Sequence, residues 1–123
     1  MSELQRQIDG INWYHEFDFG GGLRAEPRTP DAKSHRRLWR FIEGQLDNLD
    51  FAGKTVLDIG CWDGYWSFYA ERRKAHRVLA TDDTSQNWAG EAGFRLAHKL
   101  LRSSVEVDLQ RSVYDLNSVR DKL

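Results

Sequence analysis

Two glycines that follow a short apolar run constrain this 123-residue chain more than any other feature of its sequence. Residues 56–64 read VLDIGCWDG, and the apolar side chains before Gly60 predict a buried strand over residues 54–60. A helix is predicted over residues 65–74, so the chain passes from strand to helix through a glycine turn. Gly60 permits close approach of a ligand to the backbone, and Gly64 permits close packing of the helix on the strand. The amide N–H groups of such a turn bind a carboxylate or a phosphate.

Strands and helices alternate after this turn. Further strands are predicted over residues 77–82 and 104–109, with an amphipathic helix over residues 91–102 between them. This alternation predicts an α/β fold built on a Rossmann-like parallel sheet with right-handed crossovers. The expected strand order is 3-2-1, which leaves the strand at residues 54–60 at an apolar edge. Self-association through that exposed edge is therefore expected.

The first part of the chain has a different pattern. Residues 1–52 are predicted to form an N-terminal extension, an aromatic leader and an amphipathic helix that cap the sheet domain of residues 53–123. The leader, residues 1–28, is predicted to be irregular, because four aromatic side chains precede a run of three glycines. A helix is predicted over residues 30–48, with Thr29 as its N-cap. Its inward stripe is expected at Leu38, Ile42, Leu46 and Leu49.

Composition excludes several classes of protein. With 40% apolar and 30% charged residues and a net charge of −1, the chain has no strong field that attracts nucleic acid or membrane. It has no apolar run of membrane-spanning length, its N-terminus is polar, and its one cysteine excludes an internal disulfide framework. These features predict a cytoplasmic protein with no membrane partner. No metal site is expected from the spacing of His15, His35, His76 and His98.

Acidic residues near the turn indicate a nucleoside ligand. Asp82 ends the second predicted strand, where an acid accepts hydrogen bonds from ribose hydroxyls. Nicotinamide and flavin sites prefer G-x-G-x-x-G, whereas Asp58, Gly60 and Gly64 form D-x-G-x-x-x-G and Trp62 replaces the middle glycine. A carboxylate at Asp58 disfavours a pyrophosphate and attracts an ammonium group. A ligand with adenosine at one end and an amino acid at the other is S-adenosylmethionine.

Residues 56–64 resemble motif I of the class I S-adenosylmethionine-dependent methyltransferases. The WDG variant with ERR at residues 71–73, WYHEFDFG at residues 13–20 and AGFRLAH at residues 92–98 more narrowly resemble the tRNA uridine-34 (mo5U34, wobble) methyltransferase-like proteins. The resemblance extends over about residues 11–117. It implies methyl transfer from S-adenosylmethionine to an acceptor, which is a tRNA wobble uridine or a small molecule.

The resemblance also implies roles for individual residues. Asp82 would hold the ribose hydroxyls, Asp83 would flank the adenine, and Asp115 would accept from the adenine amino group. The methionine end of the cofactor would be lined by Asp58, Gly60, Cys61 and Trp62. The full set of implied cofactor-binding residues is Asp58, Gly60, Cys61, Trp62, Gly64, Asp82, Asp83, Tyr114 and Asp115.

Some of these residues also fit a purely structural role. Asp115 also suits the N-cap of a following helix, and Cys61 suits a small loop position better than a nucleophile. His15 is a candidate acceptor-side base, although a histidine among aromatic residues is more often structural. The basic residues at 72–77 suit an RNA-facing patch or, more simply, cations that complement a helix C-terminus.

Two other functions fit the same pattern less well. The first is a nicotinamide-dependent oxidoreductase domain, but Trp62 stands where the G-x-G-x-x-G pattern of such domains has its second glycine. The second is a non-catalytic nucleoside-binding module, which would bind a ligand without turnover. The resemblance places the acceptor pocket and most catalytic groups from a fourth strand onward, which residue 123 does not reach. The sequence is therefore expected to be the N-terminal half of a larger methyltransferase, with weak or absent methyl transfer by itself.

Overall fold

The computed structural model describes residues 2–120 of the chain, and from α2 to β5 its elements alternate between helix and strand. In chain order these are α1 (Glu3–Asp9), β1 (Phe17–Gly20), β2 (Leu23–Ala25), α2 (Ala32–Leu46), β3 (Thr55–Ile59), α3 (Tyr65–Arg72), β4 (Arg77–Thr81), α4 (Ala92–Leu100), β5 (Glu106–Asp108), the 3₁₀ helix η1 (Val113–Asp115) and α5 (Asn117–Arg120). None of the helices within residues 2–120 has the length and apolar character needed to cross a membrane.

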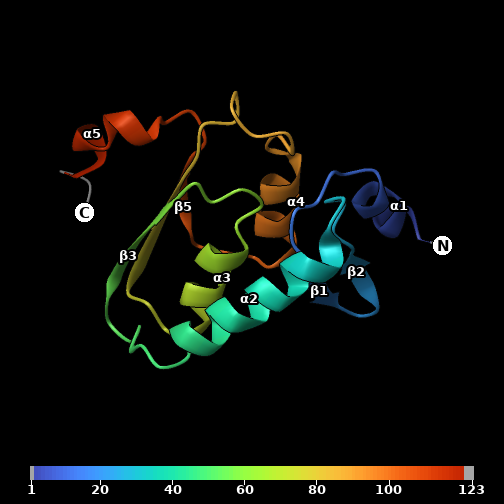
Figure 1. Cartoon of the computed structure of the whole chain (residues 1–123), viewed down its shortest axis with the longest axis horizontal. Coiled ribbons are helices and arrows are strands. Elements are labelled where there is room, and N and C mark those ends of the chain that lie inside the picture. Colours follow the sequence, from blue (N-terminus) through green and yellow to red (C-terminus); the bar gives the residue numbers. More distant parts are fainter. Residues whose placement is uncertain (1, 121–123) are drawn as a thin grey trace.

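Strands β3, β4 and β5 form a parallel sheet in that order (Figure 1). Thr55 lies opposite Arg77, and Leu79 lies opposite Glu106. Parallel strands need a crossover connection, and α3 and α4 supply the two crossovers. The predicted Rossmann-like α/β fold and the predicted 3-2-1 order are confirmed. Within the described residues β3 has a neighbour on one side alone, and its Ile59 side chain is 49% exposed.

The prediction of an irregular leader is wrong. Ser2 caps α1 by accepting a hydrogen bond from the Gln5 amide at 3.0 Å. The three glycines at 20–22 all have positive φ, and they form the tight turn between the antiparallel strands β1 and β2. The Gln5 side chain exchanges two hydrogen bonds with the backbone of Arg24, at 2.8 and 3.1 Å, which ties α1 to this hairpin.

Helix α2 forms where it was predicted, but its start and its inward face differ. The N-cap position is Asp31 rather than Thr29, and Asp31 makes no side-chain cap bond. Trp39 is the buried residue of α2, whereas Leu38 is 50% exposed and Phe41 is 65% exposed. Leu49, also expected inward, lies beyond the helix and is exposed.

The physical reason is that α2 packs on the leader. The ring of Trp39 lies 5.5 Å from that of Tyr14 and 4.8 Å from that of His15. On the same side of the helix, Arg36 donates to both Glu16 and Glu26 at 2.9 Å. The inward face of α2 is therefore partly polar, and hydrophobicity alone does not identify it.

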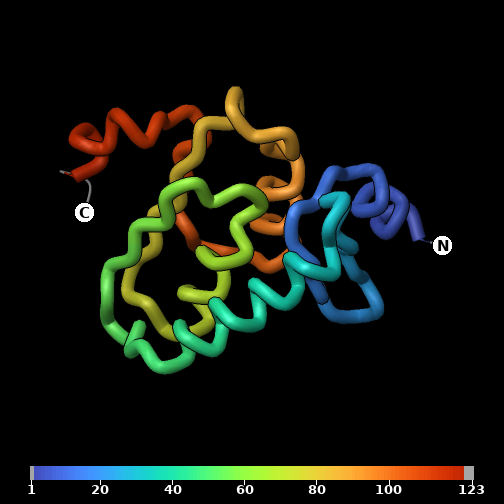
Figure 2. The backbone as a smooth tube through the Cα atoms, in the orientation of Figure 1, coloured from blue at the N-terminus to red at the C-terminus, as the bar shows by residue number. Residues whose placement is uncertain are grey.

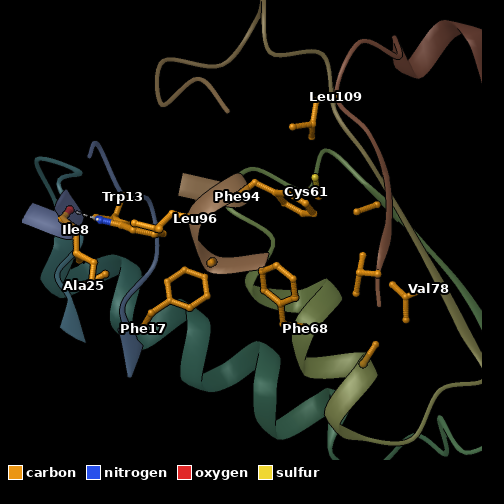
Figure 3. Close-up of a cluster of buried hydrophobic side chains, with 14 residues drawn as sticks. Ile8, Trp13, Phe17, Ala25, Cys61, Phe68, Val78, Phe94, Leu96 and Leu109 are labelled. Carbon is orange, nitrogen blue, oxygen red and sulfur yellow. Dashed lines mark hydrogen bonds between the residues drawn. The ribbon is translucent and has the colours of Figure 1, made fainter. Parts of the chain in front are cut away.

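The core is largely aromatic and joins the leader to the sheet (Figure 3). Phe68 of α3 and Phe94 of α4 lie 5.3 Å apart between ring centroids, and Trp13 and Phe17 of the leader belong to the same cluster. The indole of Trp13 is buried and donates to the carbonyl of Ile8 at 2.8 Å. Figure 2 shows the C-terminal segment, in red, beyond the upper ends of the strands and far from the N-terminus.

Candidate functional site

A cavity of about 580 Å³ lies at the carboxyl ends of β3 and β4. Ligands of open α/β sheets bind at this edge. Its wall comes from the loop after β3, the loop after β4 and the segment that leads into η1. The lining residues are Ile59, Gly60, Trp62, Thr81, Asp82, Asp83, Gln86, Asn87, Arg111, Ser112, Val113 and Tyr114. Five of the nine predicted cofactor-binding residues are among them.

Gly60 presents bare backbone to this cavity. Its amide and that of Cys61 both donate to the carbonyl of Thr81 at 2.9 Å, which folds the loop over the end of β4. Gly60 has φ of +73°, in the left-handed region that favours glycine. A Cβ at this position would meet no atom within 4 Å. The space beside its backbone is therefore open to a ligand.

Asp82 is the polar centre of the cavity wall. Its carboxylate accepts from the amides of Trp62 and Asp83, both at 2.7 Å, and from the side-chain amide of Asn87 at 3.2 Å. An ionised carboxylate accepts about four hydrogen bonds, so it retains capacity for a ligand hydroxyl. The first of these bonds holds the glycine turn against the end of β4. Asp82 thus orients the turn and also lines the cavity.

Trp62 holds an unusual backbone conformation in the turn. Its φ is +52°, which costs a residue with a Cβ about 1–2 kcal/mol. Its ring stacks on Tyr14, with centroids 5.0 Å apart and planes 21° apart, and lies 5.7 Å from the ring of Trp88. The stack and the bond to Asp82 keep this conformation, which places Trp62 in the cavity wall.

Two predicted residues lie directly behind the wall. Asp58 accepts from the hydroxyl of Ser67 at 2.6 Å, and burial raises the pKa of the Asp58 carboxyl above its ordinary value while the Ser67 bond lowers it. Cys61 is buried, and burial followed by the negative charge of Asp58 raises the pKa of its thiol far above the usual range. A thiol that stays protonated is a poor nucleophile, which agrees with the structural role for Cys61.

Two other predicted cofactor-binding residues, Gly64 and Asp115, do not line the cavity. Gly64 has φ of +86°, and a Cβ there would come within 2.6 Å of the Phe94 ring and 2.7 Å of the Phe68 ring. Its role is close helix packing. Asp115 is exposed, and its carboxylate accepts from Arg111 at 2.6 Å. Asp115 is not the N-cap of α5, which begins two residues later at Asn117.

Some residues of the wall were not anticipated from the sequence. Asn87 donates to Asp82, and Arg111 pairs with Asp108 at 3.0 Å while lining the cavity. The polar run DDTSQN at residues 82–87 was the available signal, because polar loops after parallel strands are common ligand contacts. No comparable signal preceded Arg111.

Two of the five basic residues at 72–77 make contacts inside the fold. Arg73 donates to the side chain of Asp47 and to the carbonyl of Leu49, both at 3.1 Å. Arg77 forms a pair of bonds with Glu106, one of them 2.9 Å long. These contacts favour the structural interpretation for Arg73 and Arg77, whereas Arg72, Lys74 and His76 are exposed.

His15 belongs to a buried pair that touches the glycine turn from the other side. Its Nδ1 lies 2.6 Å from the Asp63 carboxylate, which also accepts from the amides of Tyr14 and His15 at 2.9 and 2.7 Å. Both side chains of the pair are nearly inaccessible, at 3% exposed for His15 and 2% for Asp63. Asp63, which was not predicted as a site residue, thereby fastens the leader to the turn.

Comparisons with known proteins bear on the fold. No protein-family model matches the sequence, and no curated protein matches it significantly. The structure is similar to the crystal structure of a ribosomal protein L11 methylase from Lactobacillus delbrueckii subsp. bulgaricus, with a TM-score of 0.54 and 18% sequence identity. The match covers 87% of this chain and 62% of that one. This likeness shows a fold shared with a methyltransferase.

Proposed function

We propose that this chain binds S-adenosylmethionine in the cavity above β3 and β4, as the cofactor-binding part of a class I methyltransferase. The observation that carries the proposal is the pairing of open Gly60 backbone with the Asp82 carboxylate at the carboxyl ends of two adjacent parallel strands. The fold shared with an L11 methylase supports it.

The cavity suits this cofactor in size and in polarity. Its volume of about 580 Å³ lies within the range of roughly 300–1,000 Å³ that small-molecule sites occupy. Asp82 offers acceptor capacity to ribose hydroxyls, and Gly60 leaves room for the amino-acid end. Asp83 and Tyr114 line the cavity, and we assign them to the adenine end of the cofactor.

When bound, the cofactor would supply the sulfonium methyl group that an acceptor nucleophile attacks in line, and the C–S bond breaks so that S-adenosylhomocysteine leaves as a neutral thioether. The contribution of this chain is positioning, because in-line displacement gains most of its rate from geometry. The glycine turn and Asp82 would orient the cofactor. Asp58, Cys61 and Gly64 would act from behind the wall by shaping the turn, and the adenine contact of Asp115 stays a prediction.

For the methyl acceptor we propose a tRNA wobble uridine or a small molecule. The resemblance of residues 13–20 and 92–98 to the wobble-uridine methyltransferase-like proteins supports the tRNA. The internal pairing of Arg73 and Arg77 supports the small molecule, since it withdraws two of the five basic residues of the run from a phosphate backbone. Incubation with labelled S-adenosylmethionine and total tRNA, followed by nucleoside separation, distinguishes the two.

Calorimetric titration with S-adenosylhomocysteine tests the cofactor proposal. We expect the purified chain to bind this product, and Asp82→Ala to weaken binding about 10- to 100-fold, the equivalent of roughly 1–3 kcal/mol for a buried hydrogen-bonded carboxylate. Asp31→Ala is the matched control, because the Asp31 side chain makes no cap bond and lies outside the cavity. Circular dichroism of each variant verifies that it is folded.

The outcomes separate the competing functions. A folded chain that ignores S-adenosylhomocysteine contradicts the proposal. Binding of reduced nicotinamide dinucleotide instead would identify an oxidoreductase domain. Binding of S-adenosylhomocysteine without methyl transfer to any acceptor, in the longest form of the protein, would identify a nucleoside-binding module.

A further inference from the structure

Trp88 is a large apolar side chain that the fold leaves half exposed. It lies in the loop between β4 and α4, and 50% of its surface is accessible. Tryptophan is highly buried on average, so an exposed indole is an informative exception. Three other exposed apolar residues, Ile59, Val113 and Tyr114, line the cavity at the carboxyl ends of the strands. Exposed apolar side chains in such a group mark interaction sites, whereas isolated ones do not.

The loop that carries Trp88 is tied to the cavity wall. The side-chain amide of Asn87 donates to Asp82 at 3.2 Å, and its oxygen accepts from the Gly90 amide at 2.6 Å. Gly90 has φ of +69°, a conformation that favours glycine. Asn87 thus uses both ends of its amide to hold the turn at residues 87–90. These bonds set the position of the indole, although half of it is exposed.

Trp88 belongs to a cluster of three rings that reaches the cavity. Its ring centroid lies 5.7 Å from that of Trp62 and 6.4 Å from that of Tyr14, and Trp62 lines the cavity. Trp62 and Tyr14 stack with their planes 21° apart. Trp88 meets them at 55° and 57°, so neither ring lies flat on its indole. A half-exposed indole with tilted neighbours offers a face to a ligand.

The geometry of the cluster narrows the chemistry of that ligand. The three rings contact one another directly, so they leave no space between them for the ammonium group that an aromatic cage encloses. A flat indole face instead suits a second planar ring, which binds by offset stacking. Stacking accepts many conjugated rings, because each has a π-face. The carboxylates of Asp82 and Asp83 in the adjoining wall disfavour a negatively charged ring.

The place of Trp88 indicates which molecule supplies the ring. In the proposed pose the amino-acid end of the cofactor lies beside Gly60, two residues before Trp62 in the turn. The transferable methyl group is carried on the sulfur of that end, so an acceptor must approach there. Trp88 packs on Trp62 at the same end. We infer, resting on the proposed function, that Trp88 stacks on a planar conjugated ring of the methyl acceptor and selects acceptors that carry one.

NMR of the five indole N–H groups tests this stacking, with the Trp88 resonance assigned through Trp88→Phe. The probes are uridine and phenol, and the matched controls are dihydrouridine and cyclohexanol, whose rings are not planar. We expect uridine or phenol to shift the Trp88 resonance and to bind about tenfold more tightly than its control. Trp88→Leu should remove this preference, and Trp88→Phe should retain it. Phe41→Leu, which removes another exposed ring outside the cavity, should leave it unchanged.

Two further titrations place the ring and its source. S-adenosylhomocysteine should bind together with either planar probe, because Trp88 serves the acceptor rather than the cofactor. A single-stranded oligouridylate carries the same ring on a nucleic acid. Trp88-dependent binding that is much tighter for the oligonucleotide than for uridine assigns the ring to a nucleic acid, and equal binding assigns it to a small molecule. Either result supports the stacking role.

The remaining outcomes overturn the inference. These are equal binding of planar and saturated probes, a preference that persists in Trp88→Leu, and displacement of the planar probes by S-adenosylhomocysteine. Where Trp88→Leu does not fold, the Trp88 shift and the planar preference in the unaltered chain decide alone. A folded chain that does not bind S-adenosylhomocysteine contradicts the proposed function. Binding of S-adenosylhomocysteine without a preference for planar rings contradicts the role of Trp88 alone.

Discussion

Gly60 and Gly64 have similar backbone conformations and different surroundings, so they separate two uses of glycine in one turn. Replacement of Gly60 by Ala adds backbone strain alone, and we expect it to lower the free energy of unfolding by about 1 kcal/mol. Gly64→Ala adds the same strain and drives a methyl group into the Phe68 and Phe94 rings, so we expect a loss of about 3 kcal/mol. Urea unfolding measures both.

The loss of ligand affinity should be larger in Gly60→Ala than in Gly64→Ala, the reverse of the order expected for the loss of stability. Gly60→Ala places a methyl group in the space proposed for the cofactor, whereas Gly64 faces the core. S-adenosylhomocysteine binding should therefore weaken in Gly60→Ala and persist in folded Gly64→Ala. Equal stability losses, or binding lost from folded Gly64→Ala alone, would refute this division of roles.

At the same scale, sequence patterns predicted some contacts and missed others. Gly60, Trp62, Asp82, Asp83 and Tyr114 were predicted for the site, and all five line the cavity. A strand followed by a glycine turn dictates where such residues lie. The partnership of Asp63 with His15 spans 48 positions of sequence. Such a pair is created by the folding of the leader against the turn, and no local pattern encodes it.

At the scale of elements, α2 shows how tertiary contacts override periodicity. Of the predicted stripe, Ile42 and Leu46 are half-buried, but Leu38 and Leu49 are exposed, and the buried residue of the helix is Trp39. The helix packs on the aromatic leader, whose structure the sequence did not reveal. The elements of the sheet were predictable because strand, crossover helix and strand are local and regular.

A pair of substitutions tests this account of α2. Trp39→Ala removes a buried ring that contacts Tyr14 and His15, so we expect the free energy of unfolding to fall by about 3 kcal/mol. Phe41→Ala, two residues away on the exposed face, should change it by no more than about 0.5 kcal/mol. Thermal and urea unfolding give both values. A larger loss from Phe41→Ala than from Trp39→Ala would contradict this account of the inward face.

At the scale of the whole molecule, no strand within residues 2–120 pairs with the outer side of β3. Backbone groups on such an edge pair readily with a strand of another molecule. We predict that the chain self-associates through β3 in a concentration-dependent manner, observable by light scattering and sedimentation. Thr55→Lys places a charge on this edge at an exposed residue and should raise the dissociation constant about tenfold or more.

An exposed residue of the hairpin provides the control for association. Asp18→Lys alters charge on β1, which belongs to a separate sheet. It should leave the dissociation constant within about twofold of the original value. A chain that stays monomeric at high concentration, or an equal effect of both variants, would contradict pairing through β3.

The placement of the tryptophans has an optical consequence. Trp62 stands in the wall of the proposed cofactor cavity, while Trp13 and Trp39 are buried in and beside the core. The emission of Trp62 should respond to occupancy of the cavity, and that of Trp13 should shift to the red only when the core opens. Among the five tryptophans of the unmodified chain, Trp62 thus reports occupancy and Trp13 reports unfolding.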